Sequence, residues 1–240
     1  MSPQSGGPHD DRTGPPAHDD LAQARLDVAE SRRLIEDSQH RVRTRTEPDG
    51  RLLFGTWAVA WGVGYLVLWR SARSDGVPDA VAFAVFFALL VAAVTITIVH
   101  TVRRTSGLRG PGSRAGTLWG LGWPLGFSVY PFVMGGIADA GASDDVLGLV
   151  ANTLACFIVG LMYIGGGACF LENRLYVLGV WILLVGGVST VAGMPGTYLV
   201  MSVAGGGGFL VMGVVDTVLT SRRRARASAE ATGAVRQDEP

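Results

Sequence analysis

Ionisable side chains are scarce in the apolar part of this sequence, and their positions limit the chemistry it can perform. Six apolar runs lie between residues 52 and 219, and the central parts of these runs contain no Asp, Glu, Arg or His. Ion-coupled carriers and proton pumps usually place at least one such side chain at membrane depth, because its cost is tolerated only for function. The pattern therefore argues against a proton- or sodium-coupled carrier.

Two ionisable residues do lie within the apolar runs, but near one end of them. His100 and Asp216 each stand within about one helical turn of the expected membrane surface. Asp216 can pair with Arg222 or Arg223, which follow just after the same run. We predict that both residues are interfacial polar anchors, and a functional polar site is the alternative.

Motifs that carry catalytic or cofactor chemistry are missing from the sequence. It contains no GxxxxGK[ST] phosphate loop, no CxxC and no HExxH, and no serine stands near a base in the manner of a nucleophile. We therefore expect no enzyme activity, no catalytic or metal-binding residues and no cofactor. The formal net charge of zero gives no reason to expect a nucleic acid as a partner.

Glycine and proline are concentrated in the middle of the apolar runs. The last run contains Gly205–Gly208, and the third carries Pro124, Ser128 and Pro131. Small residues let helices approach closely, so tight packing is one interpretation. A broken helix at bilayer depth also survives where it lines a cavity, so a hinge or cleft between the third and sixth spans is the other.

Charged residues make up only 17% of the chain, and they are segregated from the apolar runs, which is typical of a membrane protein. Each run is near or above the ~20 residues that cross the hydrocarbon core. The fold class is therefore all-α membrane with six transmembrane helices, predicted at 52–69, 80–102, 117–138, 148–171, 175–193 and 197–219.

Arginine placement predicts the orientation of the spans. One side carries most of the arginines in the segments between spans, and short loops rich in Arg lie in the cytoplasm. We expect a multi-pass protein of the cell membrane with cytoplasmic N- and C-termini. Residues 1–20 are predicted to be a disordered tail, 21–45 a cytoplasmic amphipathic juxtamembrane helix, and 220–240 a basic and then disordered tail.

A repeat is suggested by three tryptophans. Trp57, Trp119 and Trp181 stand 62 residues apart, each near the start of an odd-numbered span. Three tandem helical hairpins of related sequence would give this spacing. The alternative is an ordinary aromatic belt at the membrane interface.

Residues 47–57 (EPDGRLLFGTW) resemble a group of uncharacterised actinobacterial six-span integral membrane proteins. The chain is also distantly similar, in architecture, to the permease subunits of ABC-2-type exporters. Those subunits have six spans, cytoplasmic ends and an amphipathic helix before the first span, but a longer element between spans five and six. Both resemblances imply a transport role without supplying functional residues.

The expected function is accordingly that of a transporter or permease-like subunit for an apolar or neutral compound. The alternative is a membrane-embedded regulatory or scaffold protein that binds a cytoplasmic partner through residues 21–45. The expected partners are the lipid bilayer and either a cytoplasmic protein or further copies of the chain.

Overall fold

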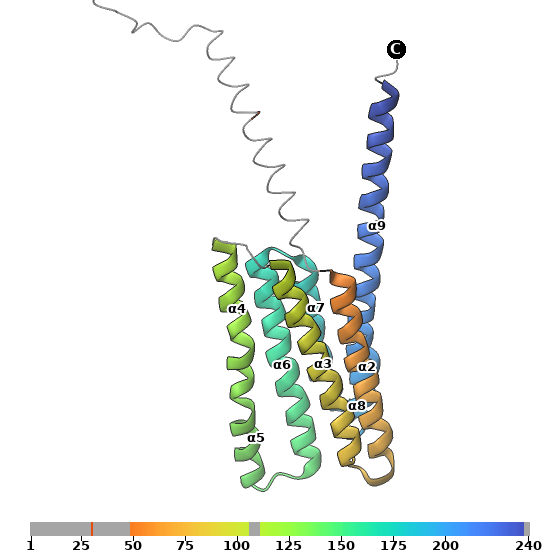
Figure 1. Cartoon of the computed structure of the whole chain (residues 1–240). Helices are drawn as coiled ribbons and strands as arrows, with labels where there is room; N and C mark the ends of the chain where they lie inside the picture. The colour runs from red at the N-terminus through yellow and green to blue at the C-terminus, as the bar shows by residue number, and fades with distance from the viewer. Residues whose placement is uncertain (1–29, 31–48, 106–110, 238–240) are drawn as a thin grey trace, which may run out of the picture. The chain divides into compact units, whose positions relative to one another are not determined.

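The computed structural model describes residues 30, 49–105 and 111–237, and all regular structure in this part of the chain is helical. The helices named below belong to the unit Pro48–Pro240. In chain order they are α2 (Gly50–Asp75), α3 (Ala80–Thr105), α4 (Pro111–Ser128), α5 (Tyr130–Asp139), α6 (Asp144–Phe170), α7 (Asn173–Ser189), η1 (Thr190–Ala192), α8 (Gly196–Val200), the π-helical turn η2 (Met201–Gly205) and α9 (Gly206–Gln237) (Figure 1).

The predicted all-helical class and the six spans are confirmed. The segments long and apolar enough to cross a membrane are Gly50–Ser74, Ala80–Arg104, Ser113–Asp139, Asp144–Phe170, Asn173–Ala192 and Gly196–Arg222. The first extends beyond its predicted end at residue 69. Arg73 remains on the helix because its guanidinium lies over the Trp69 ring, 4.8 Å from the centroid, so its stem covers apolar surface while its charge stays near water.

Local side chains set several of the helix ends. The Asp49 side chain accepts a hydrogen bond from the backbone N–H of Arg51, 3.1 Å away, and so caps α2. Ser143 caps α6 in the same manner, and Asp144 and Asp145 follow in the first turn, where they complement the helix dipole. The C-cap of α2 is Gly76, whose φ of 79° is left-handed and suits a residue without a Cβ.

The predicted flanking segments are covered only in part. Residues 1–20 and, apart from Glu30, residues 21–45 lie outside the described residues. At the other end α9 remains helical to Gln237, although the sequence predicted a basic and then disordered tail over 220–240. The Ala and Arg residues of this stretch are strong helix formers, and they prolong a helix already started in the span.

The first span begins and the last span ends at the same side of the bundle, which we call the termini side (Figure 1). An even number of crossings requires this arrangement. Which side of the membrane it faces is a prediction from the arginine placement alone.

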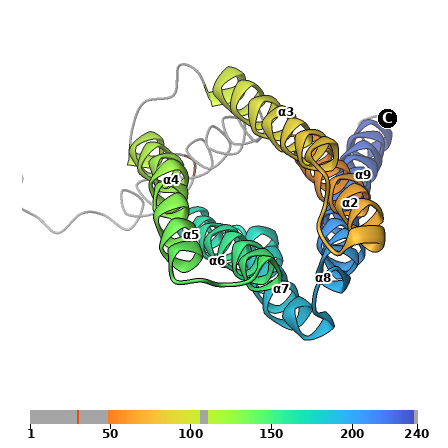
Figure 2. The ribbon, with the colours of Figure 1, turned by 90° about the horizontal axis from the view of Figure 1, so that it is seen from below.

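The spans pack in a series rather than around one central helix. Along this series α3 packs on α2, α2 on α9, α9 on α7, α7 on α6, and α6 on α4 and α5. Seen along the helices, the series forms an open arc with α3 and α4 at its two ends (Figure 2). Helices consecutive in the chain form three hairpins, namely hairpin 1 (α2 and α3), hairpin 2 (α4, α5 and α6) and hairpin 3 (α7 and α8–α9).

Two of the interfaces between hairpins, which we call joints, are closed by glycine contacts. At the first, a Cβ on Gly179 of α7 would lie 2.7 Å from the carbonyl oxygen of Gly160 of α6. At the second, a Cβ on Gly206 of α9 would lie 2.7 Å from the Cα of Gly62 of α2. No real Cβ fits at such distances, so these backbones touch directly, as small-residue helix interfaces do in membranes.

Burial is greatest where these joints meet. The largest fully buried side chains include Leu68, Ile182, Met201 and Phe209, from α2, α7, η2 and α9. In contrast, the most apolar window of the third span, α4 with α5, has no buried residue. The core of the unit therefore lies between hairpins 1 and 3 and the adjoining face of α6.

The three tryptophans of the predicted repeat share one contact. Each donates its indole N–H to the return helix of its own hairpin: Trp57 to Thr97 Oγ1 at 3.1 Å, Trp119 to the Met162 carbonyl at 2.9 Å, and Trp181 to the Ala204 carbonyl at 2.9 Å. An aromatic belt alone does not require this common role. The contacts therefore favour the interpretation of three related hairpins.

Candidate functional site

A buried polar network links four helical segments beside the core. The Tyr65 hydroxyl on α2 donates to Asn152 Oδ1 on α6 at 2.8 Å, and Asn152 Nδ2 donates to Ser189 Oγ on α7 at 3.3 Å. Ser189 Oγ in turn donates to the Gly186 carbonyl at 2.9 Å, and Thr197 Oγ1 on α8 donates to the Ser189 carbonyl at 2.9 Å. The network therefore ties all three hairpins together.

Each side chain of this network is uncharged and buried. A buried polar group in an apolar setting costs free energy unless it is hydrogen-bonded, and this network meets that requirement through its own members. The sequence analysis did not identify Asn152. The signal was present, because a lone asparagine inside a long apolar run must find a partner on another helix.

Aromatic rings extend from the network in both directions along the arc. Neighbouring ring centroids lie 5.0–6.0 Å apart, which is the usual range for paired rings. We call this set the aromatic array. From α3 through α2, α9 and α6 to α4, and back to α6, it comprises Phe86, Tyr65, Trp61, Phe209, Tyr163, Trp123, Trp119 and Phe170.

The array and the network meet at Tyr65, whose ring belongs to one and whose hydroxyl belongs to the other. Trp61, Tyr65 and Phe209 are buried, so a ligand would reach these rings between the helices, where aromatic faces suit an apolar or ring-shaped body. The Tyr65 hydroxyl and the Asn152 amide keep hydrogen-bonding capacity beyond the bonds they already make, which one neutral polar group could use. Within residues 49–105 and 111–237, no three His, Cys, Asp or Glu side chains gather closely enough to hold a metal ion. The chemistry that the rings, hydroxyls and amide of this junction support directly is binding, by ring contact and by hydrogen bonds.

The predicted site residues of the third span mark a break in that span. α4 ends at Ser128 and α5 begins at Tyr130, between Pro124 inside α4 and Pro131 near the start of α5. The Ser128 hydroxyl donates to the Leu125 carbonyl at 2.7 Å. Pro124, Ser128 and Pro131 are all exposed.

The predicted site residues of the last span are instead packed. Cβ atoms placed on three members of Gly205–Gly208 would come within 2.8 Å of Trp61, Gly62 and Trp181, and Gly207 is the exception, with nothing within 4 Å. These contacts match the tight-packing interpretation. A hinge role for the same residues stays a prediction.

The structure does not bring these two groups together. α4 packs on α6, whereas η2 and α9 pack on α2 and α7, and α6 and α7 stand between them in the arc (Figure 2). The predicted cleft between the third and sixth spans is therefore not formed by these residues. Hydropathy identifies the spans but carries no information about which spans are neighbours. The sequence therefore could not show that the third and sixth spans lie apart.

His100 and Asp216, the predicted interfacial polar residues, both lie towards the termini side and both have partners. His100 Nε2 accepts a hydrogen bond from the backbone N–H of Asp49 at 3.0 Å, which fixes the start of α2 against α3. Asp216 lies beside the same helix start, because a Cβ on Gly50 would be 2.8 Å from its Oδ2.

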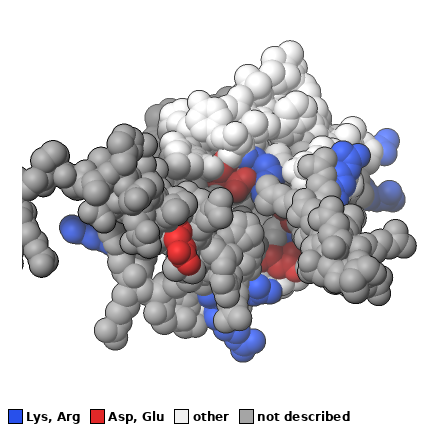
Figure 3. Space-filling view, turned by 90° about the horizontal axis from the view of Figure 1, so that it is seen from above, with Lys and Arg blue, Asp and Glu red and all other residues white. Residues whose placement is uncertain are grey.

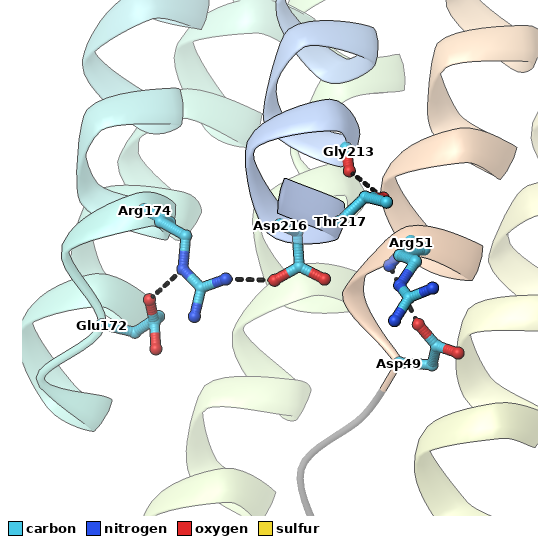
Figure 4. A network of polar contacts seen from close by, with 7 residues as sticks. All are labelled: Asp49, Arg51, Glu172, Arg174, Gly213, Asp216 and Thr217. Atoms are coloured by element: carbon cyan, nitrogen blue, oxygen red, sulfur yellow. Dashed lines mark hydrogen bonds and ion pairs between the residues drawn. The ribbon is translucent and has the colours of Figure 1, made fainter. Parts of the chain in front are cut away.

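The partner of Asp216 comes from another helix. Arg174, at the start of α7, pairs with Asp216 of α9 and also with Glu172, at 2.8 Å (Figure 4). Arg174 therefore takes the place that the sequence assigned to Arg222 or Arg223. Figure 3 looks onto this end of the molecule and shows basic and acidic side chains gathered there. These contacts join hairpin 3 internally and fit the predicted anchoring role.

Comparisons of the chain with models of known families, with curated proteins and with solved structures found no match. The function of the chain is therefore argued from the site itself.

Proposed function

We propose that this chain is a membrane transporter or permease-like subunit that binds an uncharged, apolar or aromatic compound on the aromatic array. The observation that carries the proposal is the junction at Tyr65, where the array meets the network of Asn152 and Ser189. The rings would hold the body of the compound by contact, and the hydroxyl and amide groups would exchange a hydrogen bond with one neutral polar group. The proposed role involves binding and movement without catalysis.

The preference for a neutral compound follows from the residues around the junction. Tyr65, Asn152, Ser189 and Thr197 carry no charge, and the ion pair of Arg174 with Asp216 belongs to the termini side. A charged ligand at the junction would lose its water shell without gaining an opposite charge. We also propose, from the arginine placement, that the protein lies in the cell membrane with cytoplasmic termini.

A matched series of ligands tests the proposal. Purified protein in lipid nanodiscs would be titrated with 2-naphthylmethanol, 2-naphthylmethylamine and 2-naphthoate, which share one ring system but are neutral, cationic and anionic at pH 7. Quenching of tryptophan fluorescence reports binding, since Trp61 and Trp123 belong to the array. We expect saturable binding of the alcohol and at least about tenfold weaker binding of both ions, or about 1.4 kcal/mol.

Tyr65→Phe provides the site variant, because it keeps the ring and removes the hydroxyl that donates to Asn152. We expect it to weaken binding of the alcohol several-fold. Thr56→Val is the control, because its hydroxyl is bonded only to the Leu52 carbonyl of its own helix. Equal binding of the three ligands, or equal affinity of both variants, would contradict the proposed site.

A scaffold role is the second candidate function. It is favoured by α9, which continues as a helix past the end of the last span at Arg222 to Gln237 and so offers a helical element beyond that span. Removing residues 1–45 and, in a second variant, residues 223–240 separates the two candidates in cells. A scaffold would lose its partner in affinity purification, whereas ligand binding by the six spans would be unchanged.

A further inference from the structure

In two places along the arc, the return helix of one hairpin packs on the first helix of another hairpin. A third contact of this kind would close the arc, but it is not formed. The return helix of hairpin 2 packs on the first helix of hairpin 3, and the return helix of hairpin 3 packs on the first helix of hairpin 1. The corresponding third joint would place α3, the return helix of hairpin 1, on α4, the first helix of hairpin 2. These two helices lie apart at the ends of the arc (Figure 2).

The exposed face of α4 and α5 is poorly suited to lipid. Val129, between α4 and α5, keeps right-handed helical angles (φ −77°, ψ −24°), but Pro124 and Pro131 supply no N–H to the preceding turn. Pro124, Ser128 and Pro131 are exposed at membrane depth. The carbonyls of Gly120 and Phe127 therefore lack the N–H that normally bonds to them from four residues on, and an unbonded carbonyl is costly in lipid, so a protein cover would stabilise this face.

The exposed face of α3 has the features of a helix-packing surface. Ala82 and Ala93 are buried on the side of α3 that packs on α2, and on the far side of the helix Ala84, Ala88 and Thr95 are exposed. Ala84 and Ala88 have the small-xxx-small spacing that lets two membrane helices approach closely. The face could therefore accept a helix such as α4.

Contacts between the three hairpins oppose a movement of α3 onto α4 within one chain. Tyr65 and Asn152 bond hairpin 1 to hairpin 2, and the backbone contacts of Gly62 with Gly206 and of Gly160 with Gly179 hold the two existing joints. Moving α3 onto α4 of the same chain would have to shift these contacts. Packed interfaces of this kind are not continuously deformable.

We propose that a second copy of this chain covers both faces, with α3 of each copy packed on α4 and α5 of the other. A two-fold axis along the membrane normal would cover the open faces of α3 and α4 in both copies at once. Self-complementary dimers of this kind are the commonest closed assemblies. Rotation about this axis does not invert the helices. α3 of one copy would therefore pack antiparallel to α4 of the other, as the helices do at the two existing joints. The aromatic array, which runs from Phe86 on α3 to the tryptophans of α4, would then be closed by the other copy. This assembly does not depend on the proposed ligand.

Disulfide trapping in native membranes tests the assembly. Counted from the termini side, Ala88 of α3 and Ser128 of α4 are the same number of residues into their helices. We therefore expect the two positions to lie at the same depth in the membrane. Two chains with different tags would be co-expressed, one carrying Ala88→Cys and the other Ser128→Cys, both in a background of Cys156→Ala and Cys169→Ser. After mild oxidation, we expect a disulfide-linked pair that carries both tags.

Each alternative gives a different result. A chain carrying both substitutions that forms the disulfide only within itself would show that α3 closes on its own α4, and would overturn the proposal. No disulfide in either arrangement would show that something other than a second copy covers the faces, whether lipid, water, residues 21–45 or another protein, and would overturn it too. The control combines Ala88→Cys with Val188→Cys, an exposed residue of α7 on an existing joint's outer side, and should give no linked pair.

Discussion

The two closed joints and the open ends of the arc are built from similar residues but differ in how those residues are used. At the closed joints, glycines of facing helices bring two backbones into contact, as Gly62 and Gly206 do. At the open ends, a Cβ added to Gly116 or Gly120 of α4 would have nothing within 4 Å, and Ala84 and Ala88 of α3 are exposed. Small residues in a membrane helix thus indicate that a surface is able to pack, but not which partner it meets.

The largest expected effect comes from adding one carbon to a closed joint. Gly206→Ala places a Cβ 2.7 Å from the Gly62 backbone, whereas Gly207→Ala places one in open space. We expect Gly206→Ala to lower the free energy of unfolding by about 3 kcal/mol through overpacking. Gly207→Ala should be neutral or slightly stabilising, since Ala favours helix by up to about 1 kcal/mol.

The measurement is the thermal loss of monodisperse protein in detergent, followed by size-exclusion chromatography of wild type and both variants. Equal behaviour of the two neighbouring variants would mean that the Gly62–Gly206 joint is not closed in the protein, and the contrast with the open ends would be lost.

A smaller effect is expected at the buried network. Asn152→Leu leaves the Tyr65 hydroxyl and Ser189 Oγ without the partner that links them. We expect a loss of about 1 to 2 kcal/mol, at the upper end of what hydrogen bonds between membrane helices contribute. The neighbour Thr153 is the control, because its hydroxyl bonds to the Leu149 carbonyl of the same helix at 2.8 Å, so Thr153→Val should change little.

The same unfolding assay compares these two variants. If Thr153→Val cost as much as Asn152→Leu, the network would have no special role in joining the hairpins.

The smallest effects concern the repeat. Trp57→Phe, Trp119→Phe and Trp181→Phe each remove one indole hydrogen bond to a return helix. We expect similar losses of about 0.6 kcal/mol each. Trp69→Phe is the control, because the Trp69 ring lies under Arg73 of its own helix. A measurable loss at only one of the three positions would break the equivalence of the hairpins.

The sequence was sufficient to predict how many spans there are and of what kind. Long apolar runs have one stable form in a bilayer, because a helix satisfies its own backbone. It also placed Pro124 and Pro131 in the third span, where the structure has the break between α4 and α5, since proline removes a donor wherever it stands. These predictions depend on residues close together in the chain.

Contacts between distant residues were not accessible in the same way. The pairing of Asp216 with Arg174 joins positions 42 residues apart, and Tyr65 meets Asn152 across 87. Charge and polarity identify such residues as needing partners but do not choose among several candidates. The predicted cleft between spans three and six failed for this reason, because glycine in one span and proline in another gave no evidence that the spans touch.

The central claim is that the arc is open between α3 and α4 within one chain and is closed by another copy. Pulsed electron paramagnetic resonance tests it with spin labels at positions 88 and 128. Doubly labelled chains, diluted with unlabelled chains, should give a distance well beyond the ~10 Å that separates packed helices, whereas mixed singly labelled chains should give a short one. A short distance within the diluted chain would show that the arc closes on itself and would contradict the account.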